Sequence, residues 1–358
     1  MGKQKIVVSG INLTSGGILS ILRDCLGYLS ELANDYEIIV LVNNKVLVED
    51  ISGNFSVREY PLSKKSWFLR CFYEYVYFYF LSKKIKPYLW LSLHDITANV
   101  KTEKMAVYCH NPSPFYHVKK EKLFLDKKFT LFTWFYKYLY KINIRKNTYV
   151  IVQQQWMREA FEKMYGISNI IVASPKLDRN LVKPGKKLVD TFIYPTFPRV
   201  FKNIEVIGEA LRKIDDIGIN VLVTIDGTEN VYAKKIVQQY QHLKSISFIG
   251  LQSRDKVFEY YGAVEGLIFP SKLETWGLPM SEFVETKKTI FAANLPYAKE
   301  TLAGYSDVTF FNASDSQELA DLLKDFVQKK HCISKAAPVE YDQPYVKNWG
   351  DLFRILLK

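Results

Sequence analysis

Short apolar runs alternate with segments of mixed polarity along the chain. Residues 5–10, 37–42, 105–109 and 149–152 are nearly continuous apolar stretches of strand length. Between the first two, residues 18–32 repeat apolar side chains at the spacing of an amphipathic helix. Strands that alternate with helices predict a parallel sheet, because parallel neighbours need a crossover connection. The pattern therefore predicts an α/β protein.

The same alternation returns in the second half of the chain. Further strands are expected at 192–195, 221–225, 246–250, 267–269, 289–293 and 308–311. A chain of 358 residues exceeds what one core usually holds, so two domains are expected. Residues 176–190 are polar and rich in helix and strand breakers, as a linker is. We expect a first domain at 1–175, the linker at 176–190, a second domain at 191–335 and a C-terminal segment at 336–358 that ends in a helix.

The stretch from residue 267 to residue 282 predicts a buried strand, a loop and a new helix. Gly277 lets the backbone approach a ligand closely, and Pro279 suits the first helical position. Two carboxylates flank this helix start, Glu274 from the loop and Glu282 from the expected first turn. The amides of a helix N-terminus attract phosphate, and a carboxylate there can accept hydrogen bonds from sugar hydroxyls.

A structural explanation of these two acids is also open. Ser271 and Glu274 have the spacing of a capping box, in which each side chain satisfies a backbone N–H at a helix start. Glu282 could simply favour the positive end of the helix.

Other polar residues follow predicted strands, where open α/β sheets bind ligands. His110 comes directly after the run 105–109, and His94 at the end of the preceding strand is the second choice. Lone histidines are more often structural. Gly16 and Gly17 join a strand to a helix, as a phosphate-binding turn or a packing turn does, and Lys202 at another such junction could neutralise a diphosphate or lie on the surface.

The net charge of +12 lies in one region. Residues 61–147 hold 17 Lys and Arg against 5 Asp and Glu, an excess equal to the net charge. Aromatic side chains crowd two segments of this region, 66–81 and 129–140. Charged residues interrupt both segments, which are short for membrane spans. Basic and aromatic residues together suit the surface of an anionic membrane. Core packing would also explain the aromatics, and no nucleic-acid-binding motif accompanies them, so no nucleic acid partner is expected.

The cysteines and the N-terminus bear on the compartment. The four cysteines have no spacing typical of zinc or redox sites, which suggests buried core thiols in a reducing compartment. The N-terminus lacks the long apolar region and the small-residue cleavage site of a signal peptide. We therefore expect a cytoplasmic protein.

The sequence around Glu274 and Glu282 resembles a known signature. Glu274-Thr275-Trp276-Gly277-Leu278-Pro279, followed by Glu282, is similar to the Glu-x7-Glu motif of glycosyltransferase family 4, whose members are retaining, nucleotide-sugar-dependent enzymes of the "group 1" type. The resemblance implies that Glu274 lies at the donor sugar and Glu282 at the nucleotide ribose. It places the Gly277 and Leu278 amides near sugar and phosphate.

The resemblance extends to other candidate residues. It implies that Gly16 and Gly17 lie against the donor diphosphate and the acceptor, and that His110 approaches the donor sugar or phosphate. In family 4 an Arg and a Lys about five residues apart hold the diphosphate. Lys202 matches the Lys, but Phe197 stands where the Arg is expected, and Arg199 is the nearest substitute.

The fold and reaction follow as further implications of the resemblance. The fold would be GT-B, with two Rossmann-like domains facing each other across a cleft and the last helix crossing back onto the first domain. Sugar transfer would need no bound metal and no other cofactor. The basic and aromatic region 61–147 further leads us to expect an acceptor that is a growing glycan on a lipid carrier, presented at the inner face of the cell membrane. A nucleotide-sugar 2-epimerase shares this architecture, and a non-catalytic glycan-binding or scaffold subunit would tolerate the missing Arg.

Overall fold

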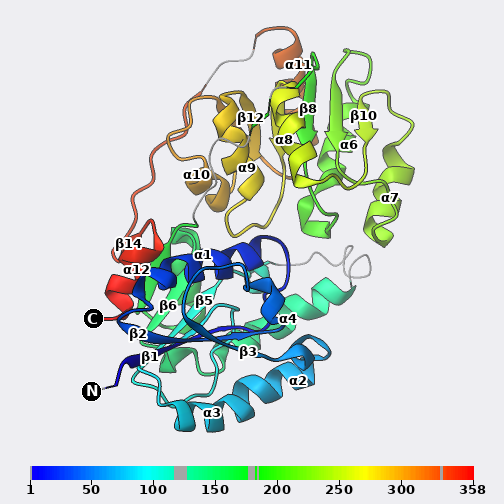
Figure 1. Cartoon of the computed structure of the whole chain (residues 1–358). Coiled ribbons are helices and arrows are strands. Elements are labelled where there is room, and N and C mark those ends of the chain that lie inside the picture. The colour runs from blue at the N-terminus through cyan, green and yellow to red at the C-terminus, as the bar shows by residue number, and fades with distance from the viewer. Residues whose placement is uncertain (1, 117–126, 176–181, 184, 331–333) are drawn as a thin grey trace. The chain divides into compact units, whose positions relative to one another are not determined.

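The computed structural model describes residues 2–116, 127–175, 182, 183, 185–330 and 334–358. Much of the expected linker, 176–181 and 184, lies outside the described residues, as does part of the basic region, 117–126. The chain forms two compact units (Figure 1). The first unit comprises residues 1–115, 134–176 and 341–358, and the second comprises residues 116–133 and 177–340.

The first unit is built on an eight-stranded sheet in which every pair of neighbours is parallel. Its order is β14-β7-β6-β5-β4-β1-β2-β3. The strands are β1 (Gln4–Gly10), β2 (Tyr36–Val42), β3 (Phe55–Glu59), β4 (Leu89–Ser92), β5 (Lys104–Cys109), β6 (Tyr149–Val152), β7 (Ile170–Ala173) and β14 (Tyr345–Val346). The helices are α1 (Gly16–Leu32), α2 (Trp67–Phe72), α3 (Phe78–Ile85), α4 (Lys127–Lys141, of which residues 134–141 belong to this unit), α5 (Gln155–Tyr165) and α12 (Trp349–Leu356).

Helices on both faces explain why the central strands are continuously apolar. On one face, Ile6 and Val8 of β1 belong to the core formed with α1 and α12. On the other face, Val7 belongs to the core formed with α3. A strand buried on both sides has no polar face, and this is why β1 contains an unbroken apolar run.

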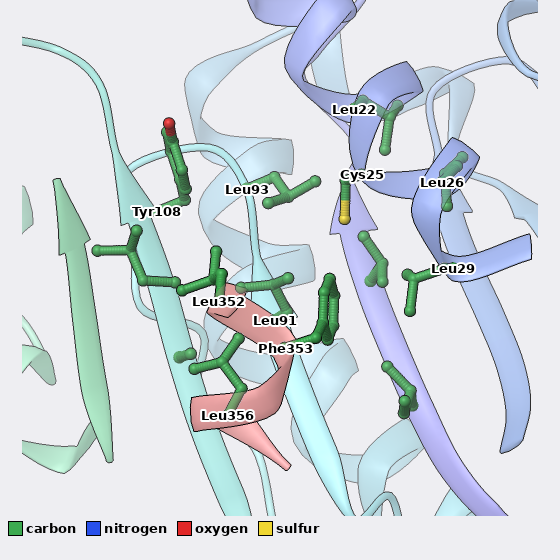
Figure 2. Close-up of a cluster of buried hydrophobic side chains, with 14 of the residues drawn as sticks. Leu22, Cys25, Leu26, Leu29, Leu91, Leu93, Tyr108, Leu352, Phe353 and Leu356 are labelled. Carbon is green, nitrogen blue, oxygen red and sulfur yellow. The ribbon is translucent and has the colours of Figure 1, made fainter. Parts of the chain in front are cut away.

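The core beneath α1 and α12 fixes the C-terminal end of the chain to the first unit (Figure 2). Tyr28 of α1 stacks on Phe353 of α12 with ring centroids 5.6 Å apart. Apolar side chains from both helices lie fully buried between them and the sheet: Leu22, Cys25, Leu26, Leu29, Leu352, Phe353 and Leu356. Residues 345–356 therefore complete the first unit, although they follow the whole of the second in sequence.

The second unit has a six-stranded parallel sheet, in the order β10-β9-β8-β11-β12-β13. A Cβ at Gly266 would lie 2.2 Å from the Phe192 ring, so only glycine fits there. The strands are β8 (Thr191–Tyr194), β9 (Asn220–Val223), β10 (Ile246–Phe248), β11 (Gly266–Phe269), β12 (Thr289–Ala293) and β13 (Val308–Phe311). The helices are α6 (Ile204–Arg212), α7 (Val231–Tyr240), α8 (Arg254–Ala263), α9 (Leu278–Phe283), α10 (Pro296–Thr301) and α11 (Ser316–Val327).

Each sheet has one switch point, which is the place in the strand order where the direction of chain winding reverses. In the first unit this point lies between β1 and β4, and in the second it lies between β8 and β11. Ligands of open α/β sheets bind at the carboxyl ends of the strands that flank such a point. Each unit therefore contains one position that favours a ligand.

Two expected elements differ in detail. The helix expected to begin at Lys202 is divided, because Asn203 adopts a left-handed conformation between the short 3₁₀ turn Val200–Lys202 and α6. The aromatic segment 66–81 forms α2, a π-helical stretch at Tyr73–Tyr77 and the start of α3. Within the described part of the chain, no helix is both long enough and apolar enough to span a membrane.

Candidate functional site

The carboxyl ends of β8 and β11 bring together two of the candidate residues. Lys202 ends the turn that follows β8, and Glu274 lies in the loop that follows β11. The Lys202 ammonium and the Glu274 carboxylate form an ion pair with an N–O distance of 2.5 Å. Both side chains are partly exposed, at 18% and 16%. The pair therefore lies at the surface of the second unit's switch point, where a ligand can reach it.

Buried hydrogen bonds fix the loop that carries Glu274. The side-chain amide of Asn203 donates to the carbonyls of Pro270 (3.2 Å) and Ala313 (2.7 Å). The Tyr297 hydroxyl donates to the Ser271 carbonyl at 2.6 Å. Ser271 donates its own hydroxyl to the Leu273 carbonyl (3.1 Å), and no helix begins there. The capping-box explanation of Ser271 and Glu274 is therefore wrong.

Gly277 begins the helix that follows this loop. It is the N-cap of α9 with a left-handed φ of +82°, which glycine adopts without strain. A Cβ at this position would lie 2.6 Å from the Met280 Cε atom. Leu278 is the first helical residue and is 38% exposed, so Pro279 occupies the second position and not the first.

Glu282 lies farther along α9 than the sequence suggested. The helix begins at Leu278, which makes Glu282 its fifth residue and places it beyond the first turn. Its carboxylate lies 3.3 Å from the Arg254 guanidinium and 3.5 Å from the Tyr261 hydroxyl. Burial, and then the charge of Glu282, raise the pKa of Tyr261. Glu282 is therefore held by side chains of α8, and the alternative that it only favours the helix end is wrong.

Arg199 lies on the same turn as Lys202. Its carbonyl accepts a hydrogen bond from the Lys202 N–H at 2.9 Å. Its guanidinium lies 5.7 Å from the centre of the Phe197 ring, the residue that stands where family 4 has Arg. The turn thus carries two cationic side chains, of which Lys202 contacts Glu274.

In the first unit, the two glycines and His110 follow strands at or next to the switch point. Gly16 is the first residue of α1 and has a φ of +64°, and Gly17 follows it. A Cβ at Gly16 would meet no atom within 4 Å, so the backbone conformation is the reason for glycine there. His110 directly follows β5, and its side chain is 11% exposed.

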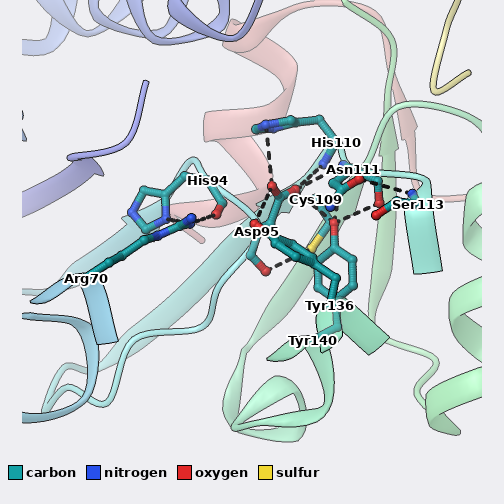
Figure 3. A network of polar contacts seen from close by, with 9 residues as sticks. All are labelled: Arg70, His94, Asp95, Cys109, His110, Asn111, Ser113, Tyr136 and Tyr140. Atoms are coloured by element: carbon teal, nitrogen blue, oxygen red, sulfur yellow. Dashed lines mark hydrogen bonds and ion pairs between the residues drawn. The ribbon is translucent and has the colours of Figure 1, made fainter. Parts of the chain in front are cut away.

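His110 is embedded in a polar network with Asp95 (Figure 3). The His110 N–H donates to Asp95 Oδ1 at 2.8 Å, and the His110 Nε2 atom lies 3.6 Å from Asp95 Oδ2. Tyr140 of α4 donates its hydroxyl to Asp95 Oδ1 at 2.8 Å. The carboxylate of Asp95 thus contacts both the backbone and the ring of His110.

His94, the second choice among the histidines, has a structural environment. Its side chain is fully buried, with Ser9 Oγ at 3.1 Å and Glu74 Oε1 at 3.2 Å from Nε2. Burial, and then the charge of Arg70, lower the pKa of His94, while burial raises the pKa of Glu74 to about 8. Both groups are therefore mainly neutral near pH 7, and their contact is not an ion pair. A side chain so enclosed does not reach a ligand.

The two candidate sites contain residues that the sequence did not single out for a role. Asp95 was not singled out from the sequence, although its place directly after His94 at a strand end is a usable signal. Tyr140 appeared only as part of an aromatic segment, and its contact with Asp95 spans 45 residues. Arg254 gave no signal, since it is an ordinary residue at the start of a helix.

The architecture is similar to that of solved glycosyltransferases. A glycosyltransferase from Rickettsia africae ESF-5 matches with a TM-score of 0.65 at 16% identity, over 92% of this chain and 89% of that one. The Anabaena protein Alr3699/HepE, solved with UDP and glucose, matches with a TM-score of 0.60 at 15% identity, over 91% of both chains. The lipopolysaccharide outer core galactosyltransferase WaaB matches with a TM-score of 0.61 at 13% identity, over 95% of this chain and 92% of that one. The chain therefore has the GT-B fold.

Sequence similarity defines the class more narrowly. Residues 175–341 match the family described as Glycosyl transferases group 1. None of the curated proteins matches the chain in sequence. The family match covers the part of the second unit that holds Lys202, Glu274 and Glu282. Together with the fold, this match supports a glycosyltransferase whose second unit is similar to the group 1 family, and placement in family 4 stays a prediction.

Proposed function

We propose that this glycosyltransferase moves a sugar, with retention of anomeric configuration, from a nucleotide-sugar donor to a growing lipid-linked glycan of a cell-surface polysaccharide or lipopolysaccharide. The observation that carries the proposal is the Lys202–Glu274 pair, 2.5 Å apart at the switch point of the second unit. Transfer from a nucleotide-sugar requires stabilisation of the charge on the leaving diphosphate, which a positioned cation supplies. Lys202 fills that role, and Glu274 binds sugar hydroxyls.

The remaining residues of the second unit bind the rest of the donor. Glu282 accepts hydrogen bonds from the ribose, with its carboxylate oriented by Arg254 and Tyr261. The amides of Gly277 and Leu278 contact the sugar and phosphate. Arg199 adds a second positive charge on the Lys202 turn and partly replaces the family arginine.

In the first unit, His110 approaches the donor sugar, and the amides of Gly16 and Gly17 contact the diphosphate and the acceptor. The start of α1 supports this role, because no acidic side chain lies in its first turn to compete for an anion. His110 is held by Asp95 and is still 11% exposed, as a residue that contacts substrate needs to be.

The reaction is proposed to be independent of metal and of any other cofactor. The sequence contains no Asp-x-Asp, the motif by which other glycosyltransferases hold a divalent cation. Lys202 and Arg199 supply positive charge for the diphosphate instead. The proposed donor class is also supported by the similarity to HepE, which was solved with UDP-glucose.

The proposed acceptor rests on the basic and aromatic surface of the first unit. Trp67 of α2 contacts the rings of Phe135 and Tyr136 of α4, so the two helices lie together. Core packing accounts for Tyr136 and Tyr140, which are buried, but many of their aromatic neighbours are exposed. We define the aromatic surface as the exposed residues Trp67 (40%), Phe68 (89%), Phe72 (49%), Phe80 (64%), Trp134 (63%) and Tyr138 (51%).

Exposed lysines accompany these rings on α3, on α4 and at the end of the turn before α2. Apolar rings insert at the headgroup level of a bilayer while ammonium groups attract anionic lipid. The chain is therefore proposed to work in the cytoplasm, bound peripherally to the inner face of the cell membrane, where a lipid-linked acceptor is presented. The lysines are Lys64, Lys65, Lys83, Lys84, Lys137 and Lys141.

A transfer assay tests this function. The purified chain is incubated with labelled nucleotide-sugars and membranes that contain lipid-linked glycans, with and without EDTA. We expect label in the lipid fraction in both conditions and an unchanged anomeric configuration in the product. Interconversion of the free donor without any acceptor would instead identify a 2-epimerase.

A further inference from the structure

Asp95 has a conformation and a set of contacts that fix the peptide backbone around His110. Its φ is +74°, in the left-handed region that Asp enters more readily than most residues. Its Oδ1 atom accepts the N–H groups of His110 at 2.8 Å and Asn111 at 3.0 Å. Two consecutive backbone donors on one carboxylate oxygen leave little freedom to the peptide that carries the imidazole.

The second carboxylate oxygen faces the imidazole itself. Asp95 Oδ2 lies 3.6 Å from His110 Nε2 and 3.4 Å from the Tyr136 hydroxyl. The two oxygens therefore have different contacts, since Oδ1 contacts the His110 backbone and Oδ2 faces its ring. A rotation of the carboxylate would disturb both contacts at once.

Tyr140 opposes such a rotation. Its ring is 1% exposed and packs edge-on against Phe161, with centroids 5.0 Å apart. From this fixed position the hydroxyl donates to Asp95 Oδ1 at 2.8 Å and accepts the Asn111 N–H at 3.3 Å. Burial, and then the charge of Asp95, raise the pKa of Tyr140, so the hydroxyl keeps the proton that it donates.

We propose that Tyr140 is a positioning residue for sugar transfer, which acts through Asp95 to set the orientation of His110. This inference rests on the proposed function, because it assumes that His110 contacts the sugar. Tyr140 itself touches no reacting atom. Its hydroxyl, on the buried side of α4, contacts Asp95, and Asp95 in turn contacts the imidazole of His110 (Figure 3).

The substitution Tyr140→Phe tests the proposal, because it removes one oxygen and leaves the packed ring in place. We expect kcat/KM for sugar transfer to fall about 10- to 100-fold, as small misplacements of catalytic groups do. Tyr36→Phe is the matched control, since Tyr36 begins β2 in the same unit, at the edge of the sheet opposite the strand ends that His110 follows, and we expect less than a twofold change.

A double-mutant cycle separates positioning from a general structural effect. In a His110→Ala background, Tyr140→Phe should cause less than a further twofold loss, because the group that it positions is gone. An equal loss in both backgrounds, or no loss in the Tyr140→Phe single variant, would overturn the proposal. If His110→Ala alone leaves transfer unchanged, the role of His110 is wrong and the inference fails with it, although the chain remains a transferase.

An NMR measurement, which does not depend on activity, tests the proposal even if the wild type transfers no sugar. The imidazole NMR signals of His110 are assigned by their loss in His110→Ala. Tyr140→Phe should shift them and Tyr36→Phe should not. If no donor is transferred by the wild type, the proposed function fails, and the positioning of His110 by Tyr140 is still supported by such a shift or overturned by unchanged signals.

Discussion

The Lys202 ammonium and the Glu274 carboxylate lie 2.5 Å apart, although 72 positions separate them in the sequence. They meet because β8 and β11 are neighbours at the switch point of the second sheet. In this structure the two charges form an ion pair with each other. A bound nucleotide-sugar would contact both, with its diphosphate on the lysine and its sugar on the glutamate, so substitutions of the two residues should have different effects.

The first prediction concerns Lys202. We expect Lys202→Met to weaken the binding of a nucleoside diphosphate by about 10- to 100-fold, because a hydrogen bond to a charged group contributes about 1.5–3 kcal/mol. Glu274→Gln should leave that affinity within about threefold but strongly reduce transfer. Isothermal titration calorimetry and steady-state kinetics measure the two effects. Lys187→Met is the control, since Lys187 forms a more exposed ion pair with Glu265 in the same unit. Equal loss of nucleotide affinity in both site variants would contradict the assigned roles.

The second prediction concerns the backbone at Gly277. Gly277→Ala forces a left-handed φ on alanine, which costs about 1–2 kcal/mol, and adds a Cβ 2.6 Å from buried Met280. Gly16→Ala has the same backbone cost but meets no atom within 4 Å. We therefore expect Gly277→Ala to lower the free energy of unfolding by about 1 kcal/mol more than Gly16→Ala does. Denaturant unfolding makes the comparison, and an equal loss in the two variants would show that Met280 moves aside without cost.

The third prediction is a pH dependence of stability that originates at Glu74. Burial raises its pKa to about 8 in the folded chain, from an ordinary value near 4.5. The folded state therefore holds a proton that the unfolded state has lost, and this contribution to stability disappears as the pH rises through 8. His94, whose pKa is lowered from 6.5, contributes stability above pH 6.5 that is lost on acidification.

Of these two groups, Glu74 is the one that makes stability depend on pH between pH 6.5 and pH 8. In that window the free energy of unfolding should fall by up to about 1.4 kcal/mol per pH unit. Glu74→Gln should flatten the slope, whereas Glu31→Gln, at an exposed position, should keep it. Urea unfolding at a series of pH values measures this. An unchanged slope in Glu74→Gln would place its origin elsewhere.

The fourth prediction concerns the aromatic surface. Phe68→Ser combined with Trp134→Ser should lower binding to vesicles that contain anionic phospholipid by about tenfold or more, because two large exposed rings can no longer insert. Val231→Ser is the control, since Val231 is 69% exposed on the second unit. Vesicle sedimentation provides the measurement. Equal binding by the double variant and the control would rule out this surface as the membrane contact.

Much of the fold could be predicted because the central strands are buried on both faces. Strands such as β6 and β12 form continuous apolar runs, and glycines and polar residues mark the loops at their ends. The candidate residues could be found for the same reason, since ligands bind where parallel strands end. The two-residue strand β14 and the π-helical stretch could not, because neither produces a hydrophobic period.

The environment of each site residue depended on contacts that sequence spacing does not contain. Glu282 was expected in a first helical turn, but the left-handed Gly277 sets the helix start so that Glu282 lies beyond it and contacts Arg254. His94 and His110 look alike in sequence, because both follow strands. Only tertiary packing separates them, since the first is enclosed with Glu74 and the second is partly exposed.

The most direct test of the account is nucleotide binding to the second unit of the full chain. A thermal-shift screen compares UDP, GDP, ADP, TDP and CMP and their sugars, without added metal, on the wild type and on Glu282→Ala. A ligand at 100 times its dissociation constant stabilises the folded state by about 2.7 kcal/mol, which a melting curve registers. We predict that one nucleotide stabilises the wild type and that this effect is lost in Glu282→Ala. Stabilisation of neither protein by any nucleotide, or equal stabilisation of both, would contradict the donor site described for Lys202, Glu274 and Glu282.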